Sequence, residues 1–327
     1  MLPLPPFSLA TPGSIEEVLA LLREHGESAT LVAGGTDLLP NMKHGLLTPR
    51  WLVSLAGVAS LRGISYTESS VRVGAMTTLE AIGEHPAIQA HARALGEAAR
   101  SVGGPHHRRM GTLGGNLCLD TRCRYYNQSH FWREALGYCL KKDGAICHVV
   151  AGGKRCVAAA SNDTAAAAIA LDATVSIVGP GGSRAVRASD FYTANGLANT
   201  ALSAGEVVTA LVVPVVAGRI SGYQKLRTRG AIDFPLLSLA ARVDLDGDLV
   251  SQLEIVVSAL AARPRSVGKA RPLALGARLA ELPTEAIAQA ARAECTPLPN
   301  IEGDALWRRE MVPVLVREAL TRLQRSV

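Results

Sequence analysis

Four cysteines in the middle of this 327-residue chain have the residue type and the grouping of a metal centre. Cys123, Cys139, Cys147 and Cys156 are separated by 15, 7 and 8 residues. Cysteines of cytosolic proteins are mostly reduced, so a group of them favours metal binding over disulfides. Four thiolates are the usual ligands of a [2Fe–2S] or [4Fe–4S] cluster. A zinc ribbon normally uses two Cys-x-x-Cys pairs, and the sequence contains none.

The surroundings of these cysteines suit an iron–sulfur cluster. The segment from about residue 120 to residue 158 holds seven basic and three acidic residues, which accounts for most of the chain's net charge of +6. It also holds five aromatic residues. Basic residues would offset the negative charge of a cluster, and aromatic bulk would exclude water. Cys118 is the main rival for a ligand position, but we expect it, like Cys295, to pack as an apolar residue.

Two glycine-rich segments have the form of phosphate-binding loops. In the first, a strand predicted over residues 29–33 runs into Gly34-Gly35-Thr36-Asp37, and a helical turn follows. Glycines let backbone N–H groups approach a phosphate, and a helix N-terminus favours negative charge. The second segment, residues 103–116, contains five glycines and a proline, and we expect a long loop with amides that point at a ligand. A Gly-Gly pair also occurs in ordinary turns, so both interpretations stay open.

Strands and helices must position these segments, and their order predicts an α+β fold. A capping residue at Ser14 starts the first helix, and strands then alternate with helices up to about residue 217. Residues 215–222 are predicted to be a connector. Long antiparallel strands follow from residue 223, with Asp246-Gly247 as a hairpin turn, and helices come last. A sheet followed by helices marks a separate α+β domain.

The composition is that of a globular protein. Charged residues make up 19% of the chain, and no run of about 18 apolar residues could span a bilayer. The first residues lack the basic flank and the apolar stretch of a signal peptide, which predicts a cytoplasmic protein. The sequence pI is about 9.1, but the basic residues are widely spread and form no recognition helix or stacking platform, so we expect no nucleic-acid partner.

Two segments taken together resemble a known family. Leu31-Val-Ala-Gly-Gly-Thr-Asp37, followed some seventy residues later by Arg109-Met-Gly-Thr-Leu-Gly-Gly-Asn116, is similar to the FAD-binding subunit of the xanthine dehydrogenase family. Tyr223-Gln-Lys-Leu-Arg227 resembles the start of that family's C-terminal flavoprotein domain. The resemblance covers nearly the whole chain except the cysteine-bearing stretch.

The resemblance implies the domain organisation. Residues 1–217 would form a vanillyl-alcohol-oxidase-like FAD-binding fold in two subdomains, about residues 1–56 and 57–217. Residues 218–327 would form a C-terminal α+β flavoprotein domain, and residues 119–160 would be an inserted iron–sulfur loop.

The resemblance also implies which residues hold FAD. The first glycine segment would wrap the pyrophosphate through backbone amides, and the second would contact the other phosphate and the ribityl chain. Asp163 would contact the flavin, and Lys225 matches a family lysine near it. No residue of the chain receives a catalytic role. The implied FAD-binding residues are Leu31, Val32, Ala33, Gly34, Gly35, Thr36, Asp37, Gly111, Thr112, Leu113, Gly114, Gly115, Asn116, Asp163 and Lys225.

One branch of the family, the 4-hydroxybenzoyl-CoA reductases, resembles the chain more closely, because its β subunit carries a cysteine-bearing insertion. This resemblance implies that Cys123, Cys139, Cys147 and Cys156 ligate a [4Fe–4S] cluster. It also implies a large molybdenum-cofactor subunit, a small [2Fe–2S] subunit and a dimer of heterotrimers. Electrons from a ferredoxin would pass through the [4Fe–4S] cluster and FAD to the [2Fe–2S] clusters and molybdenum, where 4-hydroxybenzoyl-CoA is reduced to benzoyl-CoA.

Two alternatives stay open. An oxidative FAD subunit of the aldehyde, xanthine or carbon monoxide dehydrogenase type would deliver electrons to NAD or oxygen, and its insertion would bind zinc or serve as a docking loop. A non-catalytic assembly module would have lost its flavin, which the two intact glycine segments argue against. The content of iron, sulfide, zinc and flavin separates the three.

Overall fold

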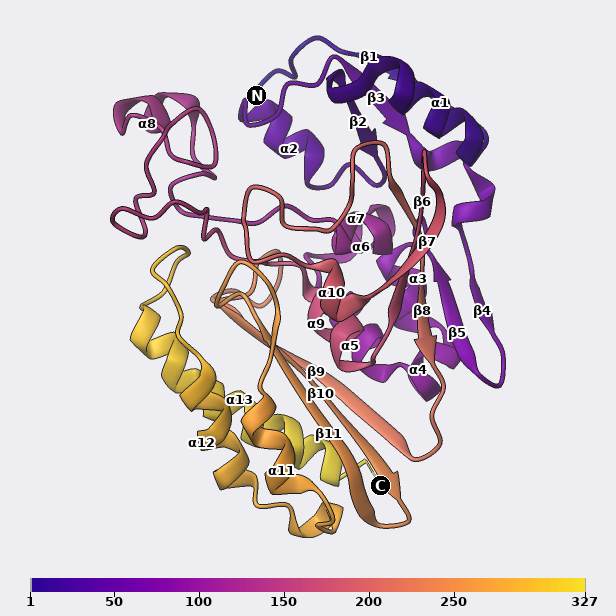
Figure 1. The fold of residues 1–327 in the computed structure, drawn as a ribbon, viewed down its shortest axis with the longest axis vertical. Coiled ribbons are helices and arrows are strands. Elements are labelled where there is room, and N and C mark those ends of the chain that lie inside the picture. Colours follow the sequence, from indigo (N-terminus) through magenta and orange to yellow (C-terminus); the bar gives the residue numbers. More distant parts are fainter. Residues whose placement is uncertain (1, 327) are drawn as a thin grey trace.

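A computed structural model describes residues 2–326 of the protein. Figure 1 shows three parts arranged along the long axis of the molecule, with the N-terminal lobe at the top and the C-terminal domain at the bottom. A loop-rich segment that carries helix α8 projects to the left, and α8 stands beside the N-terminal lobe in this view. The predicted α+β architecture is confirmed.

The N-terminal lobe is built on a three-stranded parallel sheet of order β1-β3-β2. Helix α1 begins where predicted, because the Ser14 side chain accepts the N–H of Glu17 at 3.2 Å. The apolar side of α1 packs on the sheet through Val18 and Val53, which are buried. The elements are β1 (Ser8–Ala10), α1 (Ile15–His25), β2 (Ala29–Val32), α2 (Leu38–Lys43) and β3 (Trp51–Ser54).

The middle lobe holds a five-stranded antiparallel sheet of order β4-β5-β8-β6-β7 and most of the short helices. Five of the eight residues of helix α9 are alanine, and these small side chains let it lie buried between α5 and the C-terminal sheet. The strands are β4 (Ile64–Tyr66), β5 (Ser70–Gly74), β6 (Thr174–Gly179), β7 (Gly182–Arg187) and β8 (Val207–Pro214). The helices are α3 (Leu79–Glu84), α4 (Pro86–His91), α5 (Arg93–Ser101), α6 (Pro105–Met110), α7 (Leu113–Leu117), α9 (Asp163–Ala170) and α10 (Ala188–Phe191).

The cysteine-bearing segment leaves and re-enters the middle lobe at one point. Arg122 and Ala159 form an isolated antiparallel bridge, with N–H to carbonyl distances of 2.9 and 2.7 Å. Between them the chain is mostly loop and turn, with one short helix, α8 (His130–Ala135), which Ser129 caps. The segment therefore has the connectivity of an insertion.

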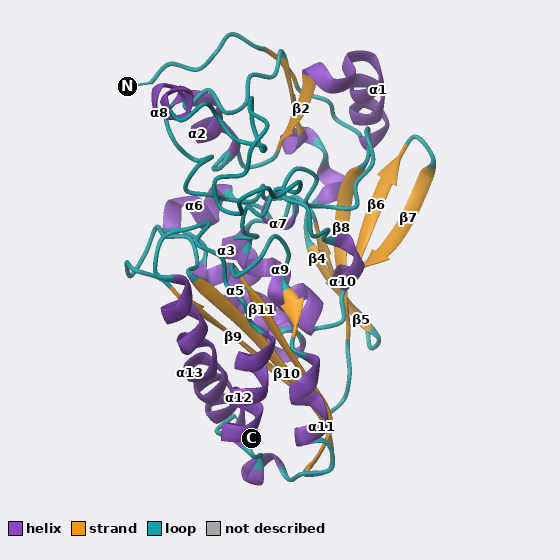
Figure 2. Cartoon of the chain, turned by 60° about the vertical axis from the view of Figure 1, so that its left-hand side comes forward, coloured by secondary structure: helices purple, strands orange, loops and turns teal. Residues whose placement is uncertain are grey.

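The C-terminal domain is a four-stranded antiparallel sheet of order β12-β11-β10-β9, covered on both faces. Figures 1 and 2 show helices α11 to α13 along one face, and α5 and α9 pack on the other. Neighbouring residues of β10 therefore point into different cores, Ala240 toward the middle lobe and Leu239 toward the C-terminal helices. The elements are β9 (Arg219–Leu226), β10 (Leu237–Asp246), β11 (Leu249–Ser258), β12 (Arg265–Ser266), α11 (Arg271–Ala274), α12 (Thr284–Glu294) and α13 (Ala305–Gln324).

Some predicted local structure was wrong. Residues 103–116 do not form one long loop, because they contain α6 and the start of α7. Proline at the first position favours the start of α6, and the Thr112 hydroxyl caps α7. The predicted connector over residues 215–222 contains the first half of β9, which begins at Arg219. The hairpin turn is confirmed, with Gly247 at φ 62°. Within residues 2–326, no helix has the length and apolar character to cross a membrane.

Candidate functional site

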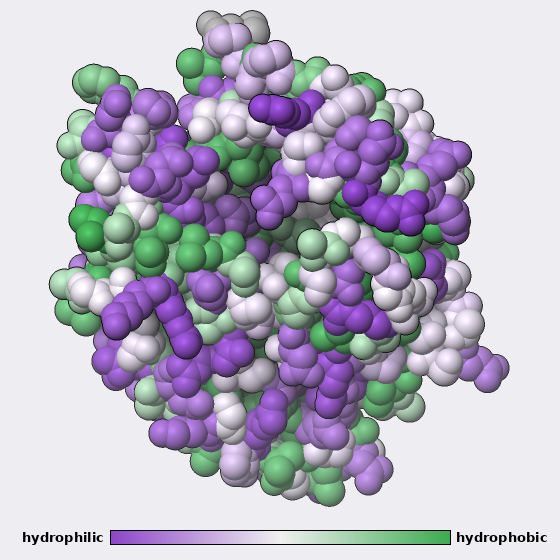
Figure 3. All heavy atoms as spheres, turned by 45° about the horizontal axis from the view of Figure 1, so that its top comes forward, coloured by the Kyte–Doolittle hydropathy of each residue, from purple (hydrophilic) through white to green (hydrophobic). Residues whose placement is uncertain are grey.

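A cavity of about 800 Å³ lies where the three parts and the insertion meet. Four segments contribute to its wall, residues 33–38, 111–116, 118–124 and 229–236. On the face seen in Figure 3, hydrophobic residues form small groups between hydrophilic ones, and the surface is hollowed near the middle of the view. A cavity of this volume has the size of a site for a cofactor or another sizeable small molecule.

The two glycine segments meet backbone to backbone in this cavity. A Cβ atom placed on Gly34 would lie 1.9 Å from the carbonyl oxygen of Met110 and 3.0 Å from the Cα of Gly111. Gly35, next to it, has φ +70°, which disfavours any side chain. The chain therefore needs glycine here for close contact between the two segments. Both segments line the same cavity, which brings their backbone within reach of one ligand, as a phosphate-binding cradle requires.

Asp37, at the end of the first glycine segment, is fixed from two sides. Asn41 donates its side-chain N–H to the carboxylate at 2.8 Å, and the guanidinium of Arg122 lies 3.8 Å away. Burial raises the pKa of Asp37, and the charge of Arg122 opposes that rise. Arg122 also stacks on the ring of Phe234 at 3.8 Å, so the start of the insertion touches both the glycine segment and the C-terminal domain.

In the second glycine segment, the side chains of two predicted site residues form hydrogen bonds within the protein. The Thr112 hydroxyl accepts the N–H of Gly115 at 3.2 Å. The Asn116 side-chain oxygen accepts two bonds from Thr164, one from its N–H at 3.0 Å and one from its hydroxyl at 2.6 Å. Asn116 thus joins the chain before the insertion to helix α9 after it, and it lines the cavity as well.

Asp163 lies in the cavity wall, and Lys225 lies behind it. The Lys225 ammonium donates to the Asp163 carboxylate at 2.9 Å and to the carbonyl of Ser101 at 3.2 Å. The phenol of Tyr223 donates to the other carboxylate oxygen at 2.6 Å. The three side chains are buried, so the structure brings both residues predicted near the flavin into one network. Sequence reasoning missed Tyr223.

The four predicted metal-binding cysteines gather at the base of the insertion. Cys123, Cys139 and Cys156 are buried in one small apolar cluster with Tyr126, and Cys147 is half-buried. Burial raises the pKa of Cys123 to about 11, and the other three thiols are near enough to add to that rise.

The remaining two cysteines lie elsewhere. Cys118 is in the cavity wall, where burial raises its pKa to about 12, and Cys295 is in the C-terminal core. The structure therefore separates the four proposed ligands from the two cysteines expected to pack as apolar residues. Within residues 2–326, no three His, Cys, Asp or Glu side chains stand close enough to hold one metal ion.

The surroundings of Cys156 leave room at its sulfur and place a positive charge nearby. A Cβ atom on Gly196 would lie 2.7 Å from its sulfur, so glycine leaves room at that sulfur. The buried ammonium of Lys141 bonds to Asp120 at 2.7 Å and to the Thr121 hydroxyl at 2.8 Å. Burial raises the pKa of Cys156, while the Ala158 amide and the Lys141 charge oppose the rise. Soft donors next to a fixed positive charge suit an anionic iron–sulfur cluster.

Sequence reasoning missed Lys141 and Arg122 as individual residues. Both belong to the basic group that the composition of the insertion had indicated. Nothing in the local sequence shows that the first would be buried against Thr121 or that the second would stack on Phe234.

Comparison with known proteins identifies relatives along the whole chain. The FAD binding domain in molybdopterin dehydrogenase matches residues 5–216, and the CO dehydrogenase flavoprotein C-terminal domain matches residues 221–323. The carbon monoxide dehydrogenase medium chain of Hydrogenophaga pseudoflava is 31% identical over 319 residues, which are 97% of this chain and 96% of the relative. The aldehyde oxidoreductase FAD-binding subunit PaoB of Escherichia coli is 32% identical over 238 residues, 70% of this chain and 74% of the relative.

Solved structures agree in fold. The carbon monoxide dehydrogenase of Hydrogenophaga pseudoflava that lacks the Mo-pyranopterin moiety contains a chain with a TM-score of 0.80 and 30% identity, and the match covers 99% of this chain and 98% of that one. The Cu,Mo-CO dehydrogenase in its cyanide-inactivated form gives a TM-score of 0.81 at 28% identity, covering 99% of this chain and 100% of that one.

Proposed function

The chain belongs to the FAD-binding medium subunits of the molybdopterin dehydrogenase family, and from this premise we propose that it transports electrons for a partner subunit that transforms the substrate. The observation that carries the proposal is the cavity in which both glycine segments meet without room for a Cβ atom. The division of the chain at about residue 217 is supported by the two family matches, which end at residue 216 and begin at residue 221.

The proposed FAD site uses backbone more than side chains. Residues 31–37 and 111–116 are proposed to hold the pyrophosphate and the ribityl chain through amide groups, which glycine allows to approach closely. Asp163 is proposed to face the flavin, since it lines the cavity and is held by two donors from behind. When bound there, FAD would exchange electrons singly or in pairs. The chain's own part is to bind FAD, orient it and keep water away.

We further propose that the insertion holds a [4Fe–4S] cluster on Cys123, Cys139, Cys147 and Cys156. Support comes from the buried cluster that holds Cys123, Cys139 and Cys156, and from the half-buried Cys147, which is near enough to affect the Cys123 thiol. The other two cysteines lie elsewhere. Ligands of a single zinc ion must all lie about 2.3 Å from it, whereas cluster ligands bind separate iron atoms and stand farther apart. The cluster would supply one-electron transfer beside the FAD cavity, since Cys123 is also in the cavity wall.

Elemental analysis tests the cluster. We expect about four irons and four sulfides per chain in protein purified without oxygen, and loss of the cluster's absorbance in C139S. The matched control is C295S, which replaces a buried cysteine of the C-terminal core and should keep the iron. One zinc per chain and no sulfide would overturn the cluster while leaving the FAD proposal standing.

The direction of electron flow has two candidates. The relatives are named dehydrogenases and oxidoreductases, which favours the oxidative direction. Electrons would leave a substrate on a large molybdenum subunit and reach FAD through a small [2Fe–2S] subunit. The clustered cysteines of the insertion favour a second candidate, the 4-hydroxybenzoyl-CoA reductase role. In that role a ferredoxin supplies electrons and the partner subunit forms benzoyl-CoA.

Assays on the complete complex separate these candidates. The oxidative role predicts reduction of an artificial acceptor by an aldehyde, a purine or carbon monoxide. The reductive role predicts benzoyl-CoA formation from 4-hydroxybenzoyl-CoA with a low-potential one-electron donor. Oxidation activity without any benzoyl-CoA formation would exclude the second candidate.

A further inference from the structure

Asp163 is a buried carboxylate whose two oxygens have separate donors. The Tyr223 phenol occupies Oδ1 at 2.6 Å, and the Lys225 ammonium occupies Oδ2 at 2.9 Å. Asp163 and Tyr223 are 3% and 4% exposed, so each bond is made in a low-dielectric setting. Asp163 lines the cavity, whereas Tyr223 is not part of its wall. Tyr223 therefore makes no direct contact with the cavity, and its hydrogen bond to Asp163 connects it to the cavity wall.

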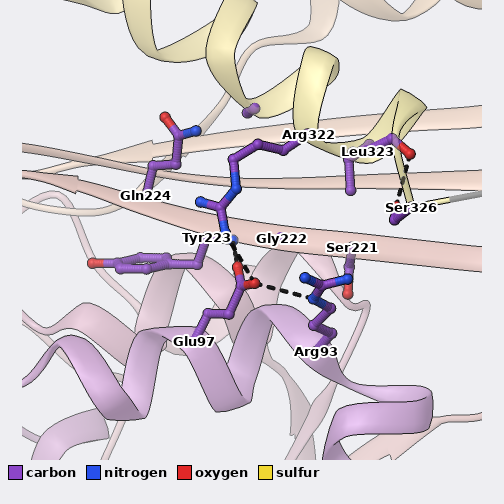
Figure 4. A pocket seen from close by; sticks show the side chains of 10 residues that line it. Arg93, Glu97, Ser221, Gly222, Tyr223, Gln224, Arg322, Leu323 and Ser326 are labelled. Carbon is purple, nitrogen blue, oxygen red and sulfur yellow. Dashed lines mark hydrogen bonds and ion pairs between the residues drawn. The ribbon is translucent and has the colours of Figure 1, made fainter.

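Tyr223 is itself held from the opposite side. It lies on β9, the edge strand of its sheet, and its N–H points outward to Glu97 of α5 at 2.8 Å. Glu97 also pairs with Arg93 of the same helix at 3.1 Å and with Arg322 of α13 at 3.2 Å. Figure 4 shows Glu97 between the two arginines, with the Tyr223 ring pointing away from them. Two helices thus fix the strand position that aims the phenol at Asp163.

We propose that Tyr223 is a positioning residue that keeps Asp163 ionised and oriented at the FAD cavity, and thereby lowers the midpoint potential of the bound flavin. The inference rests on the proposed binding of FAD in this cavity. Reduction adds electrons to the flavin, and a fixed negative charge in the cavity wall opposes added negative charge. The phenol stabilises that charge by a short, charge-assisted hydrogen bond.

The charged and titratable groups that face Asp163 are Lys225, Tyr223 and, farther off, Arg227. Burial raises the pKa of Asp163, while the Lys225 charge and the Tyr223 hydrogen bond oppose the rise. Removing the phenol takes away one of the groups that oppose this rise, so we expect Asp163 in Y223F to take up a proton at a higher pH than in the native protein. Its charge would then oppose reduction of the flavin less.

The test is a redox titration of FAD in the complete protein, comparing the native chain with Y223F. At a fixed potential near pH 7 we expect the ratio of reduced to oxidised FAD to rise about tenfold in Y223F, which is about 30 mV for two electrons. The difference should shrink as the pH is raised, because Asp163 then ionises without its phenol donor. A purely structural role would not produce this pH dependence.

The matched control is Y192F. Tyr192 is also a buried phenol, 3% exposed, but it donates to the Leu117 carbonyl at 3.2 Å. Its loss removes one buried hydrogen bond without touching a carboxylate, so the flavin potential should stay at the native value. An equal shift in both variants would contradict the inference.

The D163N variant keeps the inference testable if Y223F fails to retain FAD. In D163N the carboxylate is gone, so adding Y223F should change the potential no further, and the double variant should bind FAD like D163N alone. The inference is overturned if Y223F retains FAD and its flavin potential is unchanged. It is also overturned if the double variant loses FAD while D163N keeps it. A native chain that never binds FAD refutes the proposed function instead.

Discussion

Replacing Gly34 by alanine tests whether the two glycine segments must touch. In the native structure a Cβ at this position would lie 1.9 Å from the Met110 carbonyl oxygen and 2.6 Å from its carbon. Real Cβ atoms essentially never come within 3.0 Å of such atoms, so the segments would have to part by about 1 Å. The obstacle is backbone, which cannot rotate away as a flexible side chain can.

The size of the effect follows from this geometry. Overpacking a well-packed site costs about 1–3 kcal/mol, and a clash with backbone belongs at the upper end of that range. Since about 1.4 kcal/mol corresponds to a factor of ten, about 3 kcal/mol would weaken FAD binding about 100-fold if the two segments come into contact only when FAD is bound. If they are also in contact without FAD, part or all of the cost appears as lower stability of the apoprotein.

The total cost in G34A is therefore the sum of two measured free energies. Titration of the apoprotein with FAD gives the loss of binding free energy, and denaturant unfolding of the apoprotein gives the loss of stability. We expect the sum to exceed about 2 kcal/mol. The control is G181A, in the turn between β6 and β7, where a Cβ would meet no atom within 4 Å. A sum in G34A as small as in G181A would refute the close-contact argument.

Three further predictions follow from single contacts. Asn116→Ala should destabilise the chain by about 2 kcal/mol, because it leaves the buried Thr164 N–H without its acceptor, and a double-mutant cycle with Thr164→Val should show coupling of about 1 kcal/mol. Cys118 should resist iodoacetamide at pH 8 in the folded chain and react only as the pH approaches its raised pKa of about 12, whereas urea should expose it at pH 8. Gly196→Ala should lower the iron content, because its Cβ would press on the Cys156 sulfur, and native iron content in this variant would contradict the proposed ligand.

Features written in short stretches of sequence could be predicted. The Ser14 cap and the Asp246-Gly247 turn depend on side chains and backbone angles of a few neighbouring residues, and both are present. The two glycine segments, which the resemblance assigns to one cofactor site, line the same cavity, and their role in binding FAD stays a prediction. Local chemistry was sufficient for the cap and the turn because a capping side chain and a glycine of positive φ act within one turn of chain.

Features decided by distant contacts could not be predicted. The first half of β9 has no strong alternation of apolar residues, and pairing with residues 241–244 of β10 makes it a strand. Tyr223 lies sixty residues from Asp163, so no local pattern could show their bond. Helices α6 and α7 have six and five residues, too few to display a helical period.

The insertion can be long without disturbing the flavin cavity because its two ends are tied together. The Arg122–Ala159 bridge closes it, and Asn116 bonds to Thr164 on the far side of the bridge. The C-terminal domain holds the same base, since Asn300 accepts the Arg124 N–H at 2.7 Å and donates to the Val157 carbonyl at 2.6 Å. With its base fixed in the cavity wall, a redox group held at that base by Cys123 would lie beside the cavity. That proximity is a property of the chain's connectivity and would persist even if the outer loops, including α8, were rearranged.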